Sequence, residues 1–151
     1  MKIAIASDHA GFELKKTLLA LLKTLGHEAA DLGTNSSADA VDYPDFAAKA
    51  ALEIQAGRAE RAIVICGSGV GACVAANKFS GVRAGLCHDT YSARQGVEHD
   101  DINVLCLGAR VIGVEVAAEV VRAYLAARFS REERHRRRLD KISSFEKNFR
   151  V

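Results

Sequence analysis

Short apolar runs alternate with helical patterns along the chain, and this alternation restricts the possible folds more than any other feature. Five apolar or β-rich runs are each followed by a stretch with apolar residues at helical spacing. The predicted strands cover residues 2–7, 28–32, 61–66, 82–87 and 103–107. The predicted helices cover residues 11–25, 42–57, the segment from the glycine-rich loop to 76, 90–99 and 114–128. Strict alternation predicts right-handed crossovers and a parallel sheet covered on both faces.

We therefore predict an α/β chain of one domain, residues 1–151, with a three-layer α/β/α, Rossmann-like fold and a five-stranded parallel sheet. A sixth helix, predicted over about 130–148, has no strand to cover, so we expect it to pack on a second subunit. Its predicted start is a capping box, with Ser130 at the cap and Glu133 three residues later.

Composition indicates the cellular location of the protein and argues against membrane and metal binding. The chain is 49% apolar and 26% charged, as in ordinary soluble proteins. No apolar stretch approaches the roughly 20 residues needed to span a bilayer, and the N-terminal apolar run is too short for a signal peptide. We expect a cytoplasmic protein with no membrane partner. Four cysteines without metal-ligand spacing predict no metal site, and Cys87 and Cys106 lie in apolar runs, as buried thiols do.

Parallel α/β sheets bind ligands beyond the carboxyl ends of their strands, which selects three loops. These are residues 7–11, 66–71 and 108–110. The second is the most informative, because Cys66 ends a strand and Gly67, Gly69 and Gly71 follow it. Glycines before a helix leave N–H groups free for an anion or an oxyanion, and we expect the field of the helix N-terminus to favour the Cys66 thiolate.

Four interpretations of this loop remain open from the residues alone. It could be a tight turn with an inert cysteine, or a dinucleotide-binding loop, although it follows the third strand rather than the first. A cysteine phosphatase would need a cation in the loop, and residues 67–72 contain none. The remaining possibility is a thiolate base beside an oxyanion hole, moving a proton next to a carbonyl.

Two further groups of polar residues are candidates for catalysis or substrate binding. His99 is followed by two carboxylates, beginning with Asp100, which suits proton donation. Arg134 and Arg138 share one face of the last helix, which suits a phosphate, although a solvated charged face is the simpler alternative. The tail from 128 onwards has nine Lys or Arg against four Asp or Glu. It has few aromatic residues for stacking on bases, so we expect no nucleic-acid partner.

Taken together, these motifs resemble the type B ribose-5-phosphate isomerases, a family that also contains galactose- and allose-phosphate isomerases. The resemblance covers about residues 1–145. It lies in the Ser-Asp-His-Ala-Gly of 7–11, the Asp-Tyr-Pro of 42–44, the Cys-Gly-Ser-Gly-Val-Gly of 66–71, the His-Asp-Asp-Ile-Asn of 99–103, the Gly-Ala-Arg of 108–110, and the Arg-His of 134–135 with Arg138.

The resemblance implies an aldose–ketose isomerase that forms an enediolate and uses no metal or organic cofactor. It implies that Cys66 is the base and that the enediolate is held by the N–H groups of Gly67, Ser68, Gly69, Val70 and Gly71, with help from the Ser68 hydroxyl. It implies that His99 opens the sugar ring with help from Asp8, and that Asp100 contacts sugar hydroxyls. The phosphate, by the same resemblance, is bound by His9, Arg110, Arg134 and Arg138. It also implies a homodimer or homotetramer whose active sites are shared between subunits.

Three positions refine the resemblance. Ser68 keeps the hydroxyl that some relatives supply with Thr, and Asp100 replaces a common Asn, so sugar preference or pH dependence could differ. One branch of the family uses a Glu at the position of Ala72 in place of the cysteine. Ala72 cannot act as a base, so the resemblance points to the branch with a cysteine base. A six-carbon substrate and a non-catalytic sugar-phosphate or nucleotide sensor remain the alternatives.

Overall fold

A computed structural model describes residues 1–148. Within them, five strands form one parallel sheet in the order β2-β1-β3-β5-β4. The strands are β1 (Lys2–Ser7), β2 (Glu28–Asp31), β3 (Arg61–Cys66), β4 (Ala84–Leu86) and β5 (Val104–Gly108). The helices are the short η1 (His9–Gly11), then α1 (Phe12–Thr24), α2 (Tyr43–Gln55), α3 (Val70–Ala76), α4 (Thr90–Asp100), α5 (Val114–Ala126) and α6 (Glu133–Asn148). The predicted three-layer α/β/α fold is confirmed.

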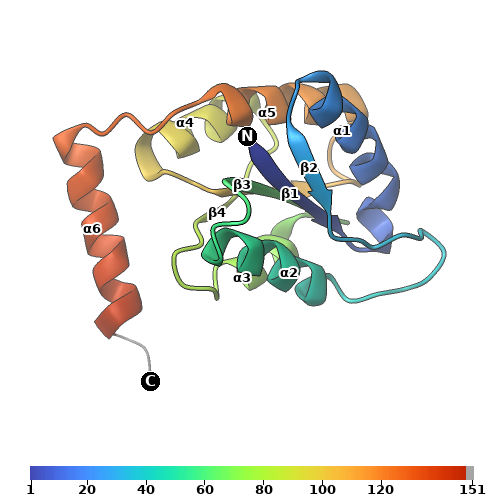
Figure 1. The fold of residues 1–151 in the computed structure, drawn as a ribbon, viewed down its shortest axis with the longest axis horizontal. Helices are drawn as coiled ribbons and strands as arrows, with labels where there is room; N and C mark the ends of the chain where they lie inside the picture. Colours follow the sequence, from blue (N-terminus) through green and yellow to red (C-terminus); the bar gives the residue numbers. More distant parts are fainter. Residues whose placement is uncertain (149–151) are drawn as a thin grey trace.

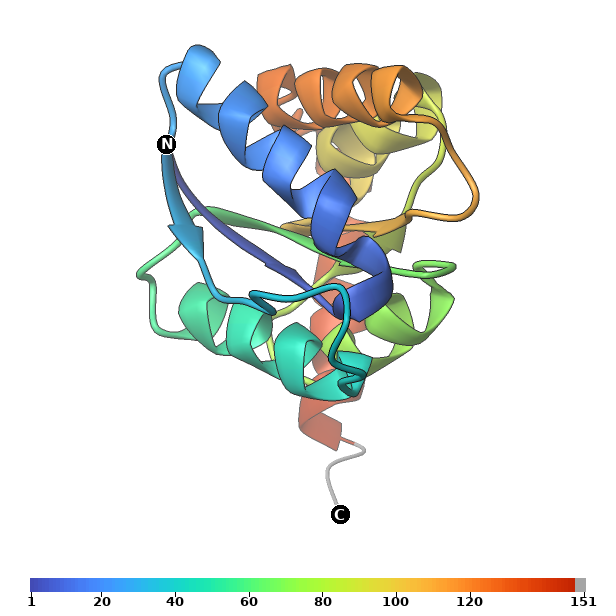
Figure 2. The ribbon, with the colours of Figure 1, turned by 90° about the vertical axis from the view of Figure 1, so that its right-hand side faces the viewer.

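Helices cover both faces of the sheet, and each face has its own apolar core. Figure 2 shows α1, α4 and α5 on one face and α2 and α3 on the other. Successive side chains of a strand point to opposite faces. Accordingly, Ile5 of β1 packs with Leu18 of α1 in one core, whereas Ala6 packs with Phe46 of α2 in the other.

The strand order changes direction between β1 and β3. The chain passes from β1 to β2 on one side and then returns to place β3 on the other side, with Ser7 opposite Ile65. Such a switch point opens a crevice at the carboxyl ends of the two strands. The loops after Ser7 and Cys66, which the sequence predicted to carry chemistry, therefore lie side by side.

The last helix, α6, stands at the side of the α/β body and contacts α4 (Figure 1). The Glu146 carboxylate anchors it by accepting hydrogen bonds from the Gly81 N–H at 3.1 Å and the Ser80 hydroxyl at 3.2 Å. The predicted capping box was wrong. Arg131 has φ of 58°, so the chain turns there and helix α6 begins only at Glu133. No helix in residues 1–148 is long and apolar enough to cross a bilayer.

Candidate active site

Cys66 ends β3 with its thiol against the glycine-rich turn that leads into α3. The Gly69 N–H donates a hydrogen bond to the Cys66 sulfur at 3.1 Å. Cys66 is only 4% exposed, so this donor acts where water competes little. A main-chain N–H at a helix start stabilises negative charge on a thiol. The arrangement therefore suits a cysteine that acts as a base.

Close packing holds the turn in place from both sides. Gly69 has φ of +79°, a left-handed conformation that glycine adopts readily, and an added Cβ there would lie 2.8 Å from the Leu107 carbonyl carbon. A Cβ on Gly71 would lie 2.5 Å from the ring of Tyr43. The turn is thus enclosed between the end of β5 and Tyr43. The first N–H groups of helix α3 have no partner within the helix, so they can bind an oxyanion.

The loop after β1 brings two more predicted residues to the same edge. The Asp8 N–H donates to the Ile65 carbonyl at 3.2 Å, which ties this loop to the end of β3. The buried Asp8 carboxylate accepts the Gly11 N–H at 3.0 Å and caps η1. His9 Nδ1 lies 3.2 Å from both the N and the O of Val41, so the loop before α2 orients its ring.

Arg110 lies on the loop after β5, against the turn. Its N–H donates to the Gly67 carbonyl at 3.0 Å, and the Ala109 N–H donates to the Cys66 carbonyl at 2.9 Å. The Arg110 guanidinium nitrogen Nη1 lies 3.6 Å from the position that a Gly67 Cβ would occupy. A fixed positive charge thus stands beside the turn, and Arg110 joins Cys66, Asp8 and His9 as the sequence predicted.

The other predicted residues form a second group at the end of α4 and on α6. His99 stacks on His135 with ring centroids 4.1 Å apart, and its Nδ1 lies 2.9 Å from Gln95 Nε2. Burial, with the nearby charges of His99 and Arg134, lowers the pKa of His135. Arg134 and Arg138 are exposed, and Arg134 Nε donates to Glu132 at 2.8 Å.

Within one chain, the two groups lie at opposite edges of the sheet. Helix α4 runs from the carboxyl end of β4 back to the amino end of β5, so His99 and Asp100 lie at the amino edge. There the Asp100 carbonyl accepts a hydrogen bond from Arg83, which immediately precedes β4. The predicted help that Asp8 gives to His99 is therefore not formed inside a single chain.

Comparison with known proteins identifies the family. The family model described as Ribose/Galactose Isomerase matches residues 3–142. The chain belongs to this family. Ribose-5-phosphate isomerase B from Escherichia coli strain K12 is 44% identical to it over 145 residues, which cover 96% of each chain.

Two solved structures within the ribose/galactose isomerase family match the fold closely. Ribose-5-phosphate isomerase B from Clostridium thermocellum is 45% identical, with a TM-score of 0.96 and coverage of 99% of this chain and 100% of that one. The enzyme from Mycoplasma genitalium, solved with bound ribulose 5-phosphate, is 42% identical, with a TM-score of 0.92 and 97% of each chain covered.

The remaining cysteines of this family member differ sharply from one another. Cys87 and Cys106 are buried, as predicted, and burial raises the pKa of Cys87 to about 11. Cys73 lies on α3, partly exposed, and a hydrogen bond from the Cys106 thiol lowers the pKa of Cys73 to about 7. No cluster of His, Cys, Asp or Glu in residues 1–148 could hold a metal ion.

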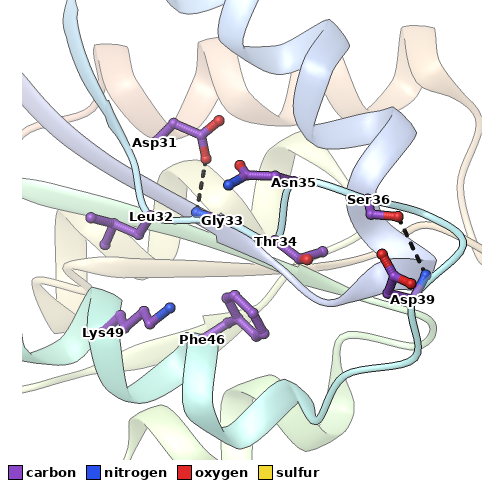
Figure 3. A pocket seen from close by; sticks show the side chains of 9 residues that line it. All are labelled: Asp31, Leu32, Gly33, Thr34, Asn35, Ser36, Asp39, Phe46 and Lys49. Atoms are coloured by element: carbon purple, nitrogen blue, oxygen red, sulfur yellow. Dashed lines mark hydrogen bonds between the residues drawn. The ribbon is translucent and has the colours of Figure 1, made fainter.

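A separate hollow of about 630 Å³ opens at the carboxyl end of β2 (Figure 3). Its lining residues are Asp31, Leu32, Gly33, Thr34, Asn35, Ser36, Asp39, Phe46 and Lys49. Asp31 accepts the Gly33 N–H there at 3.0 Å. None of the predicted site residues lines it, so it is distinct from the turn at Cys66.

Two residues at the turn were given no role by the sequence analysis. Tyr43 begins α2 and packs on Gly71, and His88 follows β4 and accepts the Gly108 N–H at 2.9 Å. Both lie at the carboxyl edge of the sheet, so the rule that selected the other loops also applied to them.

Proposed function

We propose that the protein interconverts ribose 5-phosphate and ribulose 5-phosphate through an enediolate, with Cys66 as the base. Membership of the ribose/galactose isomerase family supports an isomerase, and the relatives named ribose-5-phosphate isomerase B support this sugar. One observation carries the assignment of the base, namely the Cys66 thiol 3.1 Å from the Gly69 N–H at the switch point of the sheet.

In this mechanism the Cys66 thiolate removes the proton from C2 of the open-chain aldose. The electrons of the C2–H bond form the C1–C2 double bond, and the C1 carbonyl oxygen takes the negative charge. The N–H groups of residues 67–71 stabilise this charge, with the Ser68 hydroxyl assisting. The thiol then returns its proton to C1 while the C2 hydroxyl proton passes to the oxygen on C1, which gives the ketose.

A second copy of the chain would complete the site. His99, Asp100, Arg134 and Arg138 lie at the opposite edge from Cys66, so a partner subunit supplies them across an interface. His99 then protonates the ring oxygen with help from Asp8, and Asp100 contacts sugar hydroxyls. His9 and Arg110 of one subunit bind the phosphate with the two arginines of the other. The active form is accordingly a homodimer or homotetramer.

The base is tested by replacing Cys66 with alanine and Cys73 with alanine as the matched control. Cys73 lies on α3, the helix that follows the turn at Cys66, but it has no role in the mechanism. Cys66→Ala should lower kcat by about 10²- to 10⁴-fold, the usual effect of losing a catalytic base. Cys73→Ala should stay near the wild-type rate. Turnover by Cys66→Ala near the wild-type rate would rule out the assignment.

Subunit sharing is tested by complementation. Cys66→Ala and the double variant Arg134→Ala/Arg138→Ala should each be nearly inactive at low substrate concentration, the second mainly through a raised KM. Unfolding and refolding the two together should form mixed oligomers in which some sites contain all the residues. Recovery of activity supports the shared site, and a mixture as inactive as its parents contradicts it.

A six-carbon substrate is the alternative to ribose 5-phosphate, because the family model covers galactose as well as ribose isomerases. A panel of ribose, allose and galactose phosphates, read by ketose formation, decides between five and six carbons. A sugar-phosphate sensor would bind members of this panel without turning any over. All four cysteines are free thiols, which supports a cytoplasmic location. The relatives named ribose-5-phosphate isomerase B support a place in pentose phosphate metabolism.

A further inference from the structure

The imidazole of His88 completes the end of the sheet beside the catalytic turn. Strand β4 is short, and its last paired residue, Leu86, lies opposite Cys106. The Cys87 N–H makes one further bond to the Cys106 carbonyl at 3.3 Å, and then the chain leaves the sheet. Strand β5 extends farther, to Gly108.

The early end of β4 would leave the Gly108 N–H without a strand partner. On the other side of β5, it is the next residue, Ala109, whose N–H reaches the Cys66 carbonyl at 2.9 Å. Along a strand, successive N–H groups point to opposite neighbours, so the Gly108 N–H points toward β4. There His88 Nε2 accepts it at 2.9 Å. The ring nitrogen takes the place of the missing strand carbonyl, which requires a neutral ring with its proton on Nδ1.

The peptide that His88 holds also supports the turn at Cys66. A Cβ on Gly69 would lie 3.0 Å from the Gly108 nitrogen, and a Cβ on Gly108 would lie 2.5 Å from the Ser68 oxygen. The turn therefore rests directly on the Leu107–Gly108 peptide. Gly69 in turn donates its N–H to the Cys66 sulfur at 3.1 Å.

We propose that His88 is a positioning residue for the isomerisation, which fixes the Leu107–Gly108 peptide so that the Gly69 N–H stays aligned with the Cys66 sulfur. The inference rests on the proposed function. Without the acceptor on His88, the Gly108 N–H would be left unpaired, which is unfavourable for a buried main-chain donor. The Leu107–Gly108 peptide then reorients to pair it, and this moves the support under Gly69. The alignment of base and oxyanion donors is then lost, although the substrate-binding side chains remain.

The test compares three substitutions that differ in where they place an acceptor. His88→Gln carries its oxygen at about the position of Nε2, His88→Asn carries the same amide one methylene short, and His88→Leu has no acceptor. We expect kcat of the Asn and Leu variants to fall at least about tenfold, since small misplacements in an active site cost this much or more. KM should change less than about twofold, and the Gln variant should keep most of the wild-type kcat.

A general loss of stability would not produce this pattern. Rates are measured below the melting temperature of each variant and referred to its folded fraction, so that Asn and Gln can be compared even where Leu is destabilised. His27→Gln, at the amino edge of the sheet before β2, controls for loss of an imidazole elsewhere. Equal kcat for the Gln, Asn and Leu variants overturns the proposal. Wild-type protein that isomerises no sugar phosphate overturns the proposed function instead.

Discussion

Replacing Gly69 with alanine is expected to disable catalysis while leaving most of the fold intact. Gly69 combines φ of +79° with close packing, and a Cβ there would meet the Leu107 carbonyl carbon at 2.8 Å and the Gly108 nitrogen at 3.0 Å. These two are main-chain atoms of β5, which cannot swing aside, whereas the third neighbour, Leu86 Cδ1 at 2.6 Å, ends a flexible side chain. The turn itself must therefore move.

The size of the movement follows from these distances. An ordinary contact begins near 3.4 Å, so the turn must retreat from Leu107 by about 0.6 Å. The retreat disturbs the 3.1 Å contact between the Gly69 N–H and the Cys66 sulfur. A displacement of this order costs about 10- to 100-fold in kcat. The left-handed backbone adds about 1 kcal/mol to the loss of stability.

Gly57→Ala is the matched control. Gly57 also has positive φ, +65°, but a Cβ there meets nothing within 4 Å. It should therefore show the backbone cost alone, as a loss of about 1 kcal/mol in urea unfolding with kcat unchanged. Steady-state kinetics and urea unfolding of both variants decide the matter. A Gly69→Ala enzyme with kcat within threefold of wild type would refute the role of this turn.

Two other predictions concern a buried charge and an unused thiol. Lys15 is 1% exposed and pairs with Asp31, which is 37% exposed, so Asp31→Asn strands a buried ammonium and should cost about 3 kcal/mol in urea unfolding. Lys15→Met leaves only the hydrated carboxylate and should cost less than about 1 kcal/mol; equal losses would contradict this asymmetry. Because thiolates are the reactive form, alkylation of Cys73, with its pKa of about 7, should rise from pH 6 to 8, whereas Cys87, with its pKa of about 11, should stay unlabelled. Peptide mass spectrometry measures the extent of alkylation at each cysteine, and labelling of Cys87 before Cys73 would show the prediction to be wrong.

The position of the turn after Cys66 could be predicted because several independent signals coincide there. The apolar run before Cys66 marks a strand, the glycines mark its end, and the alternation of elements determines which edge of the sheet the turn occupies. The same logic placed Asp8, His9 and Arg110 beside it. These are consequences of chain order, and they do not depend on the details of side-chain packing.

Other features depend on packing that a single sequence does not reveal. The start of α6 is set by the left-handed conformation of Arg131, and an arginine carries no local signal for it. The role of His88 depends on where β4 ends, and residues 82–87 favour a strand throughout, so propensity alone placed the end too late. The burial of Lys15 likewise follows from its pairing with Asp31, which lies on a different element.

The turn after Cys66 limits the ways in which mutation can change this site during evolution. Its key donor belongs to the peptide backbone, because Gly69 meets the sulfur with its main-chain N–H. Proline is the only residue that lacks this N–H, and its φ is fixed near −65°, far from the +79° of Gly69, so a mutation that keeps the turn can affect the donor only by crowding it. At most positions alanine scanning removes side-chain atoms, but at Gly69 it adds a methyl group. The variant therefore measures the effect of a steric clash and not the effect of losing the N–H donor. Removing the donor without changing the conformation of the turn requires replacing the amide with an ester in a semisynthetic chain.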